Sequence, residues 1–273
     1  MRSPSLAEVL TTLEARYPLA LAEPWDAVGL VCGDPDDPVE RILFAVDPTE
    51  AVAAEAHRLQ IDLIVTHHPL FLTPVHGVAA LTPGGRLVHG LIERGCALYA
   101  AHTNADRARP GVSDALADLL GVRDTVPLEP DEADPNVGLG RIGTLESPMP
   151  LSAFVERVAE RLPATAQGVR AAGDPDALIE RVAVCGGSGE SLQSRASAAG
   201  ADVYVTADAK HHRTSDHLAA GGCALVDVAH WASEWPWLPV AAATLQDDLG
   251  GTVVSSVSTL VTDPWSLHVR SRS

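Results

Sequence analysis

The clearest pattern of apolar and polar positions lies in the segment that leads to two adjacent histidines, His67 and His68. An apolar run over 41–46 predicts a strand, an alanine-rich stretch over about 49–59 predicts a helix, and a second apolar run over 62–66 predicts another strand. Because short loops join these elements, the pattern favours a parallel sheet. Ligands bind beyond the carboxyl ends of the strands of such a sheet, which is where the two histidines lie.

The same reasoning predicts elements elsewhere in the chain. In chain order they are a helix over 5–20, a helix near 86–94, a strand over 96–101, a strand over 141–145 and a helix over 151–162. Proline and glycine at 73–85 predict a loop. Residues 122–138 are rich in aspartate, glutamate and proline, and we interpret them as a surface loop or linker.

The later part of the chain repeats part of the beginning. Residues 41–66 match residues 181–206 at a constant offset of 140, and the stretch that starts at Asp62 corresponds to the stretch that starts at Asp202. Chance similarity between two buried strands is the alternative to duplication. We therefore predict an α/β fold of two similar halves from an internal duplication, with mixed sheets flanked by helices. The expected domains are a first α/β half over 1–125, a short connecting segment over 126–175 and a second α/β half over 176–273.

Composition and charge limit the function classes. A net charge of -17 at pH 7, without a basic patch, argues against nucleic acid as the main partner. The longest apolar runs are of strand length and the amino-terminal residues lack the apolar core of a signal peptide, so we expect neither a membrane span nor secretion. The four cysteines form no C-x-x-C pair and predict neither a zinc knuckle nor a disulfide framework. A reducing cytoplasm is the simplest setting.

Candidate metal ligands follow the predicted strands in three clusters. The clusters are His67 with His68, His102 with Asp106, and His230 with Glu234. The last two pairs are spaced i, i+4, which places both side chains on one face of a helical turn. Histidine with carboxylate is a ligand set for zinc, manganese or iron. A single pair of this kind is more often a solvated helix face, so the prediction depends on the three clusters together.

The adjacent histidines have a geometry of their own. Pro69 lacks a backbone N–H and ends the strand, so His67 and His68 are presented on a turn. Neighbouring strand residues point to opposite sides, and the pair therefore suits two adjacent ions better than one. The alternative is that one histidine caps the strand while the other is solvated.

Two further stretches are candidates for binding phosphate. Lys210, His211 and His212 follow the strand that corresponds to 62–66 in the repeat, and we identify them as candidate substrate-binding residues. A polar loop that contacts solvent or a neighbouring subunit is the alternative. The stretch Gly186-Gly-Ser-Gly-Glu could also cradle phosphate, but it lacks the Lys-Ser/Thr of a P-loop, which favours a tight strand-to-helix turn.

Five motifs occur in a specific order over about residues 5–260. They are Trp25-Asp-Ala-Val-Gly-Leu, Asp62-Leu-Ile-Val-Thr-His-His-Pro-Leu-Phe, Ala101-His-Thr-Asn-Ala-Asp, Gly186-Gly-Ser-Gly and Asp227-Val-Ala-His-Trp-Ala-Ser-Glu. Together they resemble the NIF-three-like family, whose members are often labelled GTP cyclohydrolase 1 type 2 homologues. The resemblance implies two similar α/β halves, a dinuclear metal site between the halves and a ring-shaped homohexamer.

The resemblance also assigns residues, motif by motif. Two divalent ions per subunit, zinc, manganese or iron, would be held by His67, His68, Asp106, His230 and Glu234. Glu234 would bridge the ions, and His102 would lie near them as the catalytic residue, a proton shuttle. The chain departs from the family after Thr206, where Ala-Asp-Ala replaces the usual Gly-Glu, so the resemblance assigns no substrate contact there. The large domain that some members insert between the halves is also missing.

These features lead to two hypotheses for the function. The first is a dinuclear metal-dependent hydrolase that acts on a nucleotide or another phosphorylated small molecule through a metal-activated water, with GTP ring opening as the specific version. The second is a non-catalytic metal-binding ring that serves as a partner-binding scaffold or a metal buffer. A role in regulation through nucleic acid is disfavoured by the negative charge.

Overall fold

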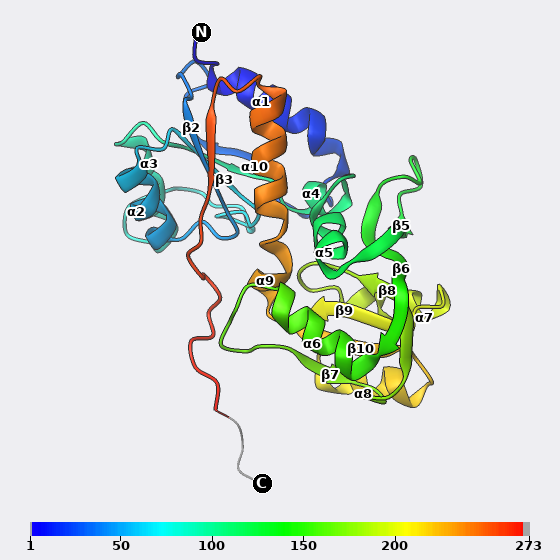
Figure 1. Ribbon diagram of the computed structural model, residues 1–273. Helices are drawn as coiled ribbons and strands as arrows, with labels where there is room; N and C mark the ends of the chain where they lie inside the picture. Colours follow the sequence, from blue (N-terminus) through cyan, green and yellow to red (C-terminus); the bar gives the residue numbers. More distant parts are fainter. Residues whose placement is uncertain (1, 270–273) are drawn as a thin grey trace. The chain divides into compact units, whose positions relative to one another are not determined.

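The computed structural model describes residues 2–269 and divides into two compact units (Figure 1). Unit 1 comprises the residues up to Ala108 together with Leu238–Thr262, and unit 2 comprises Arg109–Trp237 together with the residues after Thr262. Each unit is built on a mixed sheet flanked by helices, which confirms the predicted fold class. None of the described helices is long and apolar enough to cross a membrane.

Unit 1 contains a five-stranded sheet in the order β1-β4-β3-β2-β11. The strands are β1 (Gly29–Cys32), β2 (Arg41–Ala45), β3 (Leu63–Thr66), β4 (Ala97–Ala100) and β11 (Val254–Val257). Only β1 is antiparallel to its neighbour, while β4, β3, β2 and β11 run parallel. The helices are α1 (Leu6–Arg16), the 3-10 turn η1 (Leu19–Leu21), α2 (Glu50–Leu59), α3 (Pro83–Ile92), α4 (Thr103–Arg107) and α10 (Trp237–Asp248).

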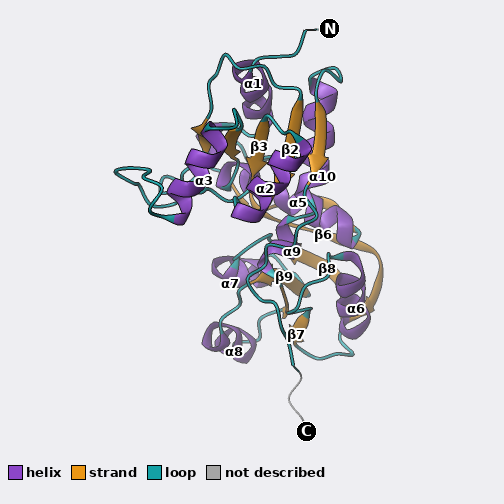
Figure 2. Cartoon of the chain, turned by 90° about the vertical axis from the view of Figure 1, so that its left-hand side faces the viewer, coloured by secondary structure: helices purple, strands orange, loops and turns teal. Residues whose placement is uncertain are grey.

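Local sequence explains where these helices begin. Ser5 and Glu8 form a capping box at the start of α1, and the Thr49 hydroxyl accepts a hydrogen bond from a backbone N–H of α2. Thr82 caps α3, and the first residue of this helix is Pro83. Proline is favoured at the first position of a helix. Alternate strand residues such as Leu43 then pack against α2 and α3, which cover one face of the sheet (Figure 2).

Unit 2 contains a six-stranded sheet in the order β5-β6-β8-β9-β10-β7. The strands are β5 (Val122–Pro130), β6 (Gly138–Pro150), β7 (Arg170–Ala172), β8 (Leu178–Val184), β9 (Val203–Ala207) and β10 (Ala224–Val228). Strands β8, β9 and β10 are parallel, and the outer pairings are antiparallel. The helices are α5 (Val112–Leu120), α6 (Leu151–Arg161), the 3-10 turn η2 (Glu190–Leu192), α7 (Gln193–Ala198), α8 (His211–Ala219) and α9 (His230–Glu234).

Equivalent hydrogen bonds occur in the two stretches that repeat in the sequence, 41–66 in unit 1 and 181–206 in unit 2. In unit 1 the Asp62 carboxylate accepts from the backbone N–H groups of Glu40 and Arg41, at 2.8 and 2.9 Å. In unit 2 the Asp202 carboxylate accepts in the same way from Glu180 and Arg181, at 2.9 and 2.7 Å. The aspartate therefore ties the start of its own strand to the parallel neighbour in both units, at the start of β2 in unit 1 and within β8 in unit 2, which supports the expectation of two similar halves.

The structure divides the chain at other points than the predicted segments 1–125, 126–175 and 176–273. The stretch 126–175 holds most of β5, all of β6, α6 and β7, and β6 lies inside the unit 2 sheet between β5 and β8. The chain also returns to unit 1 after Trp237, because β11 pairs in parallel with β2. Long-range strand pairing of this kind leaves no local pattern in a sequence.

The prediction of a loop or linker over 122–138 was wrong for its first nine residues. They form β5, an edge strand that pairs only with β6, so much of its length is exposed and suits polar residues. Proline is tolerated on such a strand because one side of the backbone has no partner. The predicted strand over 141–145 is likewise only part of the thirteen-residue β6.

A buried ion pair links α5 to β6 within unit 2. The Arg141 side chain is fully buried, and its guanidinium donates two hydrogen bonds of 2.7 Å to the two carboxylate oxygens of Asp114. A third and a fourth bond go to the backbone oxygens of Gly138 and Gly140. A bidentate, fully bonded arginine of this kind is costly to disrupt from one side, because the remaining charge stays buried.

Replacement of Asp114 by alanine should therefore lower the free energy of unfolding by about 3–5 kcal/mol, since it leaves the Arg141 charge buried without its counter-ion. Denaturant titration followed by circular dichroism measures this change. Asp118→Ala is the matched control, because Asp118 is an exposed aspartate on the same helix, and it should change stability by no more than about 0.5 kcal/mol. Equal effects of the two substitutions would contradict the role assigned to the ion pair.

Candidate metal centre

Three histidines come together at the carboxyl ends of two neighbouring parallel strands of unit 1. His67 and His68 follow β3, and His102 follows β4 after one intervening residue. The ring centroids lie 5.1 to 5.5 Å apart. Each ring offers a nitrogen, and the three nitrogens lie within 4.8 Å of one another, a spacing that allows them to hold a metal ion. The parallel pairing of β3 with β4 creates this cluster, because it brings both strand ends to one edge of the sheet.

Asp106 lies beside the same cluster. His102 stands at the N-cap position of α4, and Asp106 follows one helical turn later. The Nε2 atom of His67 lies 3.7 Å from Oδ1 of Asp106. His67 is fully buried, whereas 17% of the Asp106 side chain is exposed. Unit 1 therefore gathers three imidazoles and one carboxylate that the sequence places in two separate motifs.

The three rings share one hydrogen-bond arrangement, in which Nδ1 faces an acceptor. The acceptors are the backbone oxygen of Ala101 for His67 at 3.0 Å, Oδ1 of Asp47 for His68 at 2.6 Å, and Oδ1 of Asp26 for His102 at 2.8 Å. A carbonyl or a carboxylate can only accept, so Nδ1 carries the proton in each ring. That tautomer leaves the Nε2 lone pair as the ligand atom, and metal-binding histidines are oriented in this way.

Asp26 is the most firmly held of these acceptors. Its side chain is fully buried and also accepts hydrogen bonds from the backbone N–H of Ala27 at 2.7 Å and of Thr103 at 3.0 Å, and from the Thr103 hydroxyl. Burial raises the pKa of Asp26, but the hydrogen bonds from His102 and Thr103 outweigh burial and hold the pKa below its ordinary value. The carboxylate therefore stays ionised at neutral pH and keeps the His102 ring in one orientation.

Asp47 connects the cluster to the segment of unit 1 that follows β11. One carboxylate oxygen accepts from His68, and the other accepts from the hydroxyl of Thr262. Our sequence reasoning did not identify Asp26 or Asp47 as site residues. Both carried a usable signal, since Asp26 lies in the first family motif and Asp47 is an acidic residue directly after a predicted strand.

In unit 2, His230 and Glu234 lie together on α9 as their i, i+4 spacing predicts. Nε2 of His230 lies 2.9 Å from Oε1 of Glu234, and Nδ1 lies 2.7 Å from Oδ2 of Asp208. Glu234 is buried. Two atoms that bind one ion at about 2.1 Å are about 3 Å apart, so this pair can contact the same metal. Asp208 is a further orienting residue that our sequence reasoning did not assign.

The glycine stretch that follows β8 makes this pair possible. A Cβ atom on Gly187 would lie 2.4 Å from Oε1 of Glu234 and 3.1 Å from Nε2 of His230, and the residue has a φ of +64°. Only glycine fits this close approach. The N–H groups of Gly186, Gly187 and Gly189 donate to the hydroxyls of Ser113, Ser233 and Thr206. Because these donors are used internally, the stretch is a tight turn and not a phosphate cradle.

The candidate substrate-binding residues lie at the start of α8. Lys210 is the N-cap residue, and its ammonium group lies 3.3 Å from Oε2 of Glu190 while 77% of the side chain is exposed. His211 and His212 are exposed, with their ring centroids 5.1 Å apart. A phosphate at Lys210 would compete with Glu190. Substrate binding by these three residues stays a prediction.

Comparison with known sequences places the chain in a family. A sequence model of Duf34/NIF3 (NGG1p interacting factor 3) matches residues 4–264. A Streptomyces coelicolor protein named GTP cyclohydrolase 1 type 2 homolog is 52% identical over 98% of this chain and 96% of its own length. A Mycobacterium tuberculosis protein of the same name is 39% identical over 368 aligned residues, 96% of this chain and 97% of the relative. That alignment is longer than this chain, so the relative has segments that are missing here.

Solved structures with the same fold agree with the sequence comparison. A Bacillus cereus protein related to NIF3 superimposes with a TM-score of 0.90 at 26% identity, over 98% of this chain and 100% of the other. Reduced HcgD from Methanocaldococcus jannaschii gives a TM-score of 0.76, also at 26% identity, over 94% of this chain and 98% of the other. The sequence model, the relatives and the solved structures agree with the ordered motifs, and we conclude that the chain belongs to the Duf34/NIF3 family.

Proposed function

We propose that this protein is a metal-dependent hydrolase that acts on a nucleotide or another phosphorylated small molecule, with GTP ring opening as the specific reaction suggested by its relatives' names. The observation that carries the proposal is the common tautomer of the unit 1 histidines. Each Nδ1 is held by an acceptor, so Nε2 of His67 and of His68 is oriented as a ligand and Nε2 of His102 is available to a proton. The three rings also converge, with a nitrogen of each within 4.8 Å of the others, so that they can reach one ion.

The donor chemistry fits zinc, manganese or iron. Imidazole nitrogen and carboxylate oxygen are the ligands these ions accept, and a calcium or magnesium site would be built from oxygen. In this proposal two divalent ions would be held by His67, His68 and Asp106 of unit 1 and by His230 and Glu234 of unit 2. We assign the unit 2 residues to the same centre from the family resemblance. Such ions lower the pKa of water and stabilise negative charge on the reacting oxygens.

In this proposal His102 acts as the proton shuttle. Its Nδ1 donates to the buried, ionised Asp26, which leaves Nε2 to accept a proton from the attacking water and return it to the leaving group. The pairing of a carboxylate with Nδ1 also stabilises the protonated ring formed between these two steps. Asp26 thus acts through His102 as a positioning residue and does not itself exchange a proton with substrate.

The same proposal includes the assembly and the compartment. We propose a homohexamer, as the family resemblance implies, with a small molecule as substrate. All four cysteines are free thiols in the structure, which suits a reducing cytoplasm. The net charge of -17 disfavours a nucleic acid partner.

One observation favours the non-catalytic alternative, a metal-binding ring that serves as a scaffold or a metal buffer. The groups that could receive a substrate phosphate in unit 2 already have internal partners: Lys210 is paired with Glu190, and the glycine N–H groups donate to hydroxyls. The alternative predicts that the wild-type protein binds metal and assembles but turns over no substrate. It also predicts that assembly and metal content survive when His102 and Lys210 are both replaced by alanine.

The orienting role of Asp47 gives a test of metal binding that does not need a substrate. Asp47→Ala removes the acceptor of His68 Nδ1 and should weaken zinc binding by about 10- to 100-fold, measured by competition with a chromophoric chelator. Asp36→Ala, which changes an exposed aspartate in the turn between β1 and β2, should leave zinc affinity unchanged. Zinc affinity that is equal in the two variants would contradict a ligand role for His68.

Turnover tests the hydrolase directly. Protein loaded with zinc, manganese or iron should hydrolyse at least one compound of a nucleotide and phosphoester panel, and His67→Ala should abolish this activity because it removes a ligand. His102→Ala should keep the metal but lower the turnover rate by about 10²- to 10⁴-fold. His89→Ala, an exposed histidine on α3, is the control and should be fully active. Absence of turnover with every metal would reject the enzyme and favour the scaffold.

A further inference from the structure

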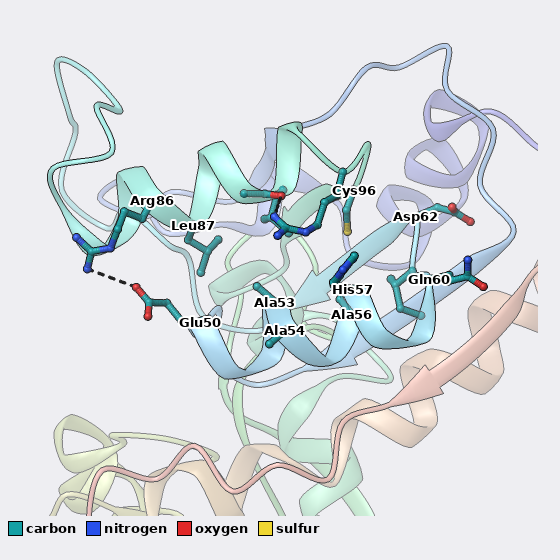
Figure 3. A pocket seen from close by; sticks show the side chains of 14 residues that line it. Glu50, Ala53, Ala54, Ala56, His57, Gln60, Asp62, Arg86, Leu87 and Cys96 are labelled. Atoms are coloured by element: carbon teal, nitrogen blue, oxygen red, sulfur yellow. Dashed lines mark hydrogen bonds and ion pairs between the residues drawn. The ribbon is translucent and has the colours of Figure 1, made fainter.

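A groove of about 790 Å³ runs between α2 and α3 of unit 1 (Figure 3). Its floor is apolar and belongs to the core of the unit, with Ala56, Ile61, Leu87, Leu91 and Cys96 all buried. Figure 3 shows Arg86 and Glu50 joined at one end, Gln60 and Asp62 at the other, and alanines of α2 between them. A volume of this size is typical of sites for small molecules, which are concave and mostly apolar with a few polar groups.

Small residues on both helices keep the groove open. Ala53 and Ala54 line it from α2, and Gly90 lines it from α3. A Cβ atom on Gly90 would meet only the Nη1 atom of Arg94, at 3.2 Å, so no packing against backbone requires a glycine there. Gly90 also lies inside a helix, where glycine is unfavourable. Glycine at position 90 therefore lowers the stability of α3 although packing does not require it. Its effect is to leave room in the groove.

Two arginines and two carboxylates line the groove, and Arg94 is an exposed arginine whose guanidinium is not the one paired with Glu50. Arg86 pairs with Glu50 at 3.4 Å, and the Asp62 carboxylate accepts from two backbone N–H groups. Arg94 donates to the backbone oxygen of Gly90 at 2.7 Å, and no carboxylate of residues 2–269 forms an ion pair with it. A guanidinium has five N–H donors in a fork that matches a carboxylate. In a chain with a net charge of -17, an arginine left in this state above an apolar floor suits an anion.

The groove is separate from the histidine cluster of unit 1. Asp62, at one end of the groove, precedes β3, whereas His67 follows β3 at its carboxyl end. None of the candidate metal ligands lines the groove. A ligand held there would therefore not be the substrate of the proposed metal centre.

We propose that the groove binds a small amphipathic anion, a carboxylate with an apolar chain. The carboxylate accepts hydrogen bonds from the Arg94 guanidinium, and the chain lies along Ala53, Ala54 and Leu87 on the floor and walls. Burial of the chain supplies the favourable free energy, and Arg94 selects the charged head group.

Octanoate is the probe, and octanamide, with the same chain and no charge, is its neutral counterpart. Isothermal titration calorimetry with metal-free protein should show saturable binding of octanoate with a Kd below about 1 mM. Arg94→Gln and octanamide should each weaken binding by about 10-fold, because each removes the charged hydrogen bond. Gly90→Leu should abolish binding, since its side chain fills the groove while it favours the helix, and circular dichroism should show that the variant is folded.

Two control variants separate this site from others. Arg58→Gln changes an arginine of α2 that pairs with Glu55 and does not line the groove, and it should bind octanoate like the wild type. His67→Ala should also bind it normally, whether or not the metal centre is catalytic. Binding that persists in Gly90→Leu, or that is lost in His67→Ala, would overturn the proposal. Absence of octanoate binding together with a change of mass in Gly90→Leu would overturn it in favour of a second copy of the chain as the occupant.

Discussion

The hydrogen bond from an imidazole Nδ1 to a fixed acceptor is the interaction on which the candidate centre depends. It occurs at His67, His68 and His102 in unit 1 and at His230 in unit 2. In the three unit 1 rings it sets the tautomer and the orientation, so that Nε2 is available to a ligand or a proton. In His230 the Nε2 atom also faces a carboxylate, that of Glu234, at 2.9 Å. The acceptors come from β-strand ends and loops that the sheets hold rigidly. The chemistry of the site is therefore a consequence of the sheet edge on which it stands.

The two units have the same hydrogen bonds between neighbouring parallel strands but different residues after the following strand. The aspartates that tie neighbouring strands together, Asp62 and Asp202, make equivalent hydrogen bonds, whereas the residues after the next strand differ. His68 in the first unit corresponds to Asp208 in the second, in the alignment at an offset of 140. Asp208 orients His230 and does not take the place of a ligand. The two units therefore agree at the aspartates that join neighbouring strands and differ at the residues that follow β3 and β9.

Much of the negative charge of the chain remains at the surface, but a few carboxylates have defined tasks inside it. Asp26 and Asp47 orient histidines, and Asp114 neutralises the buried Arg141. Each of these carboxylates accepts more than one hydrogen bond, which offsets the cost of removing charge from water. Composition alone does not distinguish them from the solvated majority. Their role depends on the donors that surround them, and those donors come from distant parts of the chain.

Periodicity, short loops and residue type are local properties, and they were enough to predict the α/β class, the strand-helix-strand pattern that recurs along the chain and the histidine motifs. The sequence by itself did not determine that β5 and β6 join the unit 2 sheet or that β11 returns to β2, because strand pairing is a long-range choice. Nor did it show the acceptors behind each imidazole. Only the folded chain brings Asp26 to His102 and Asp47 to His68, since hydrogen bonds between residues 76 and 21 positions apart depend on tertiary packing.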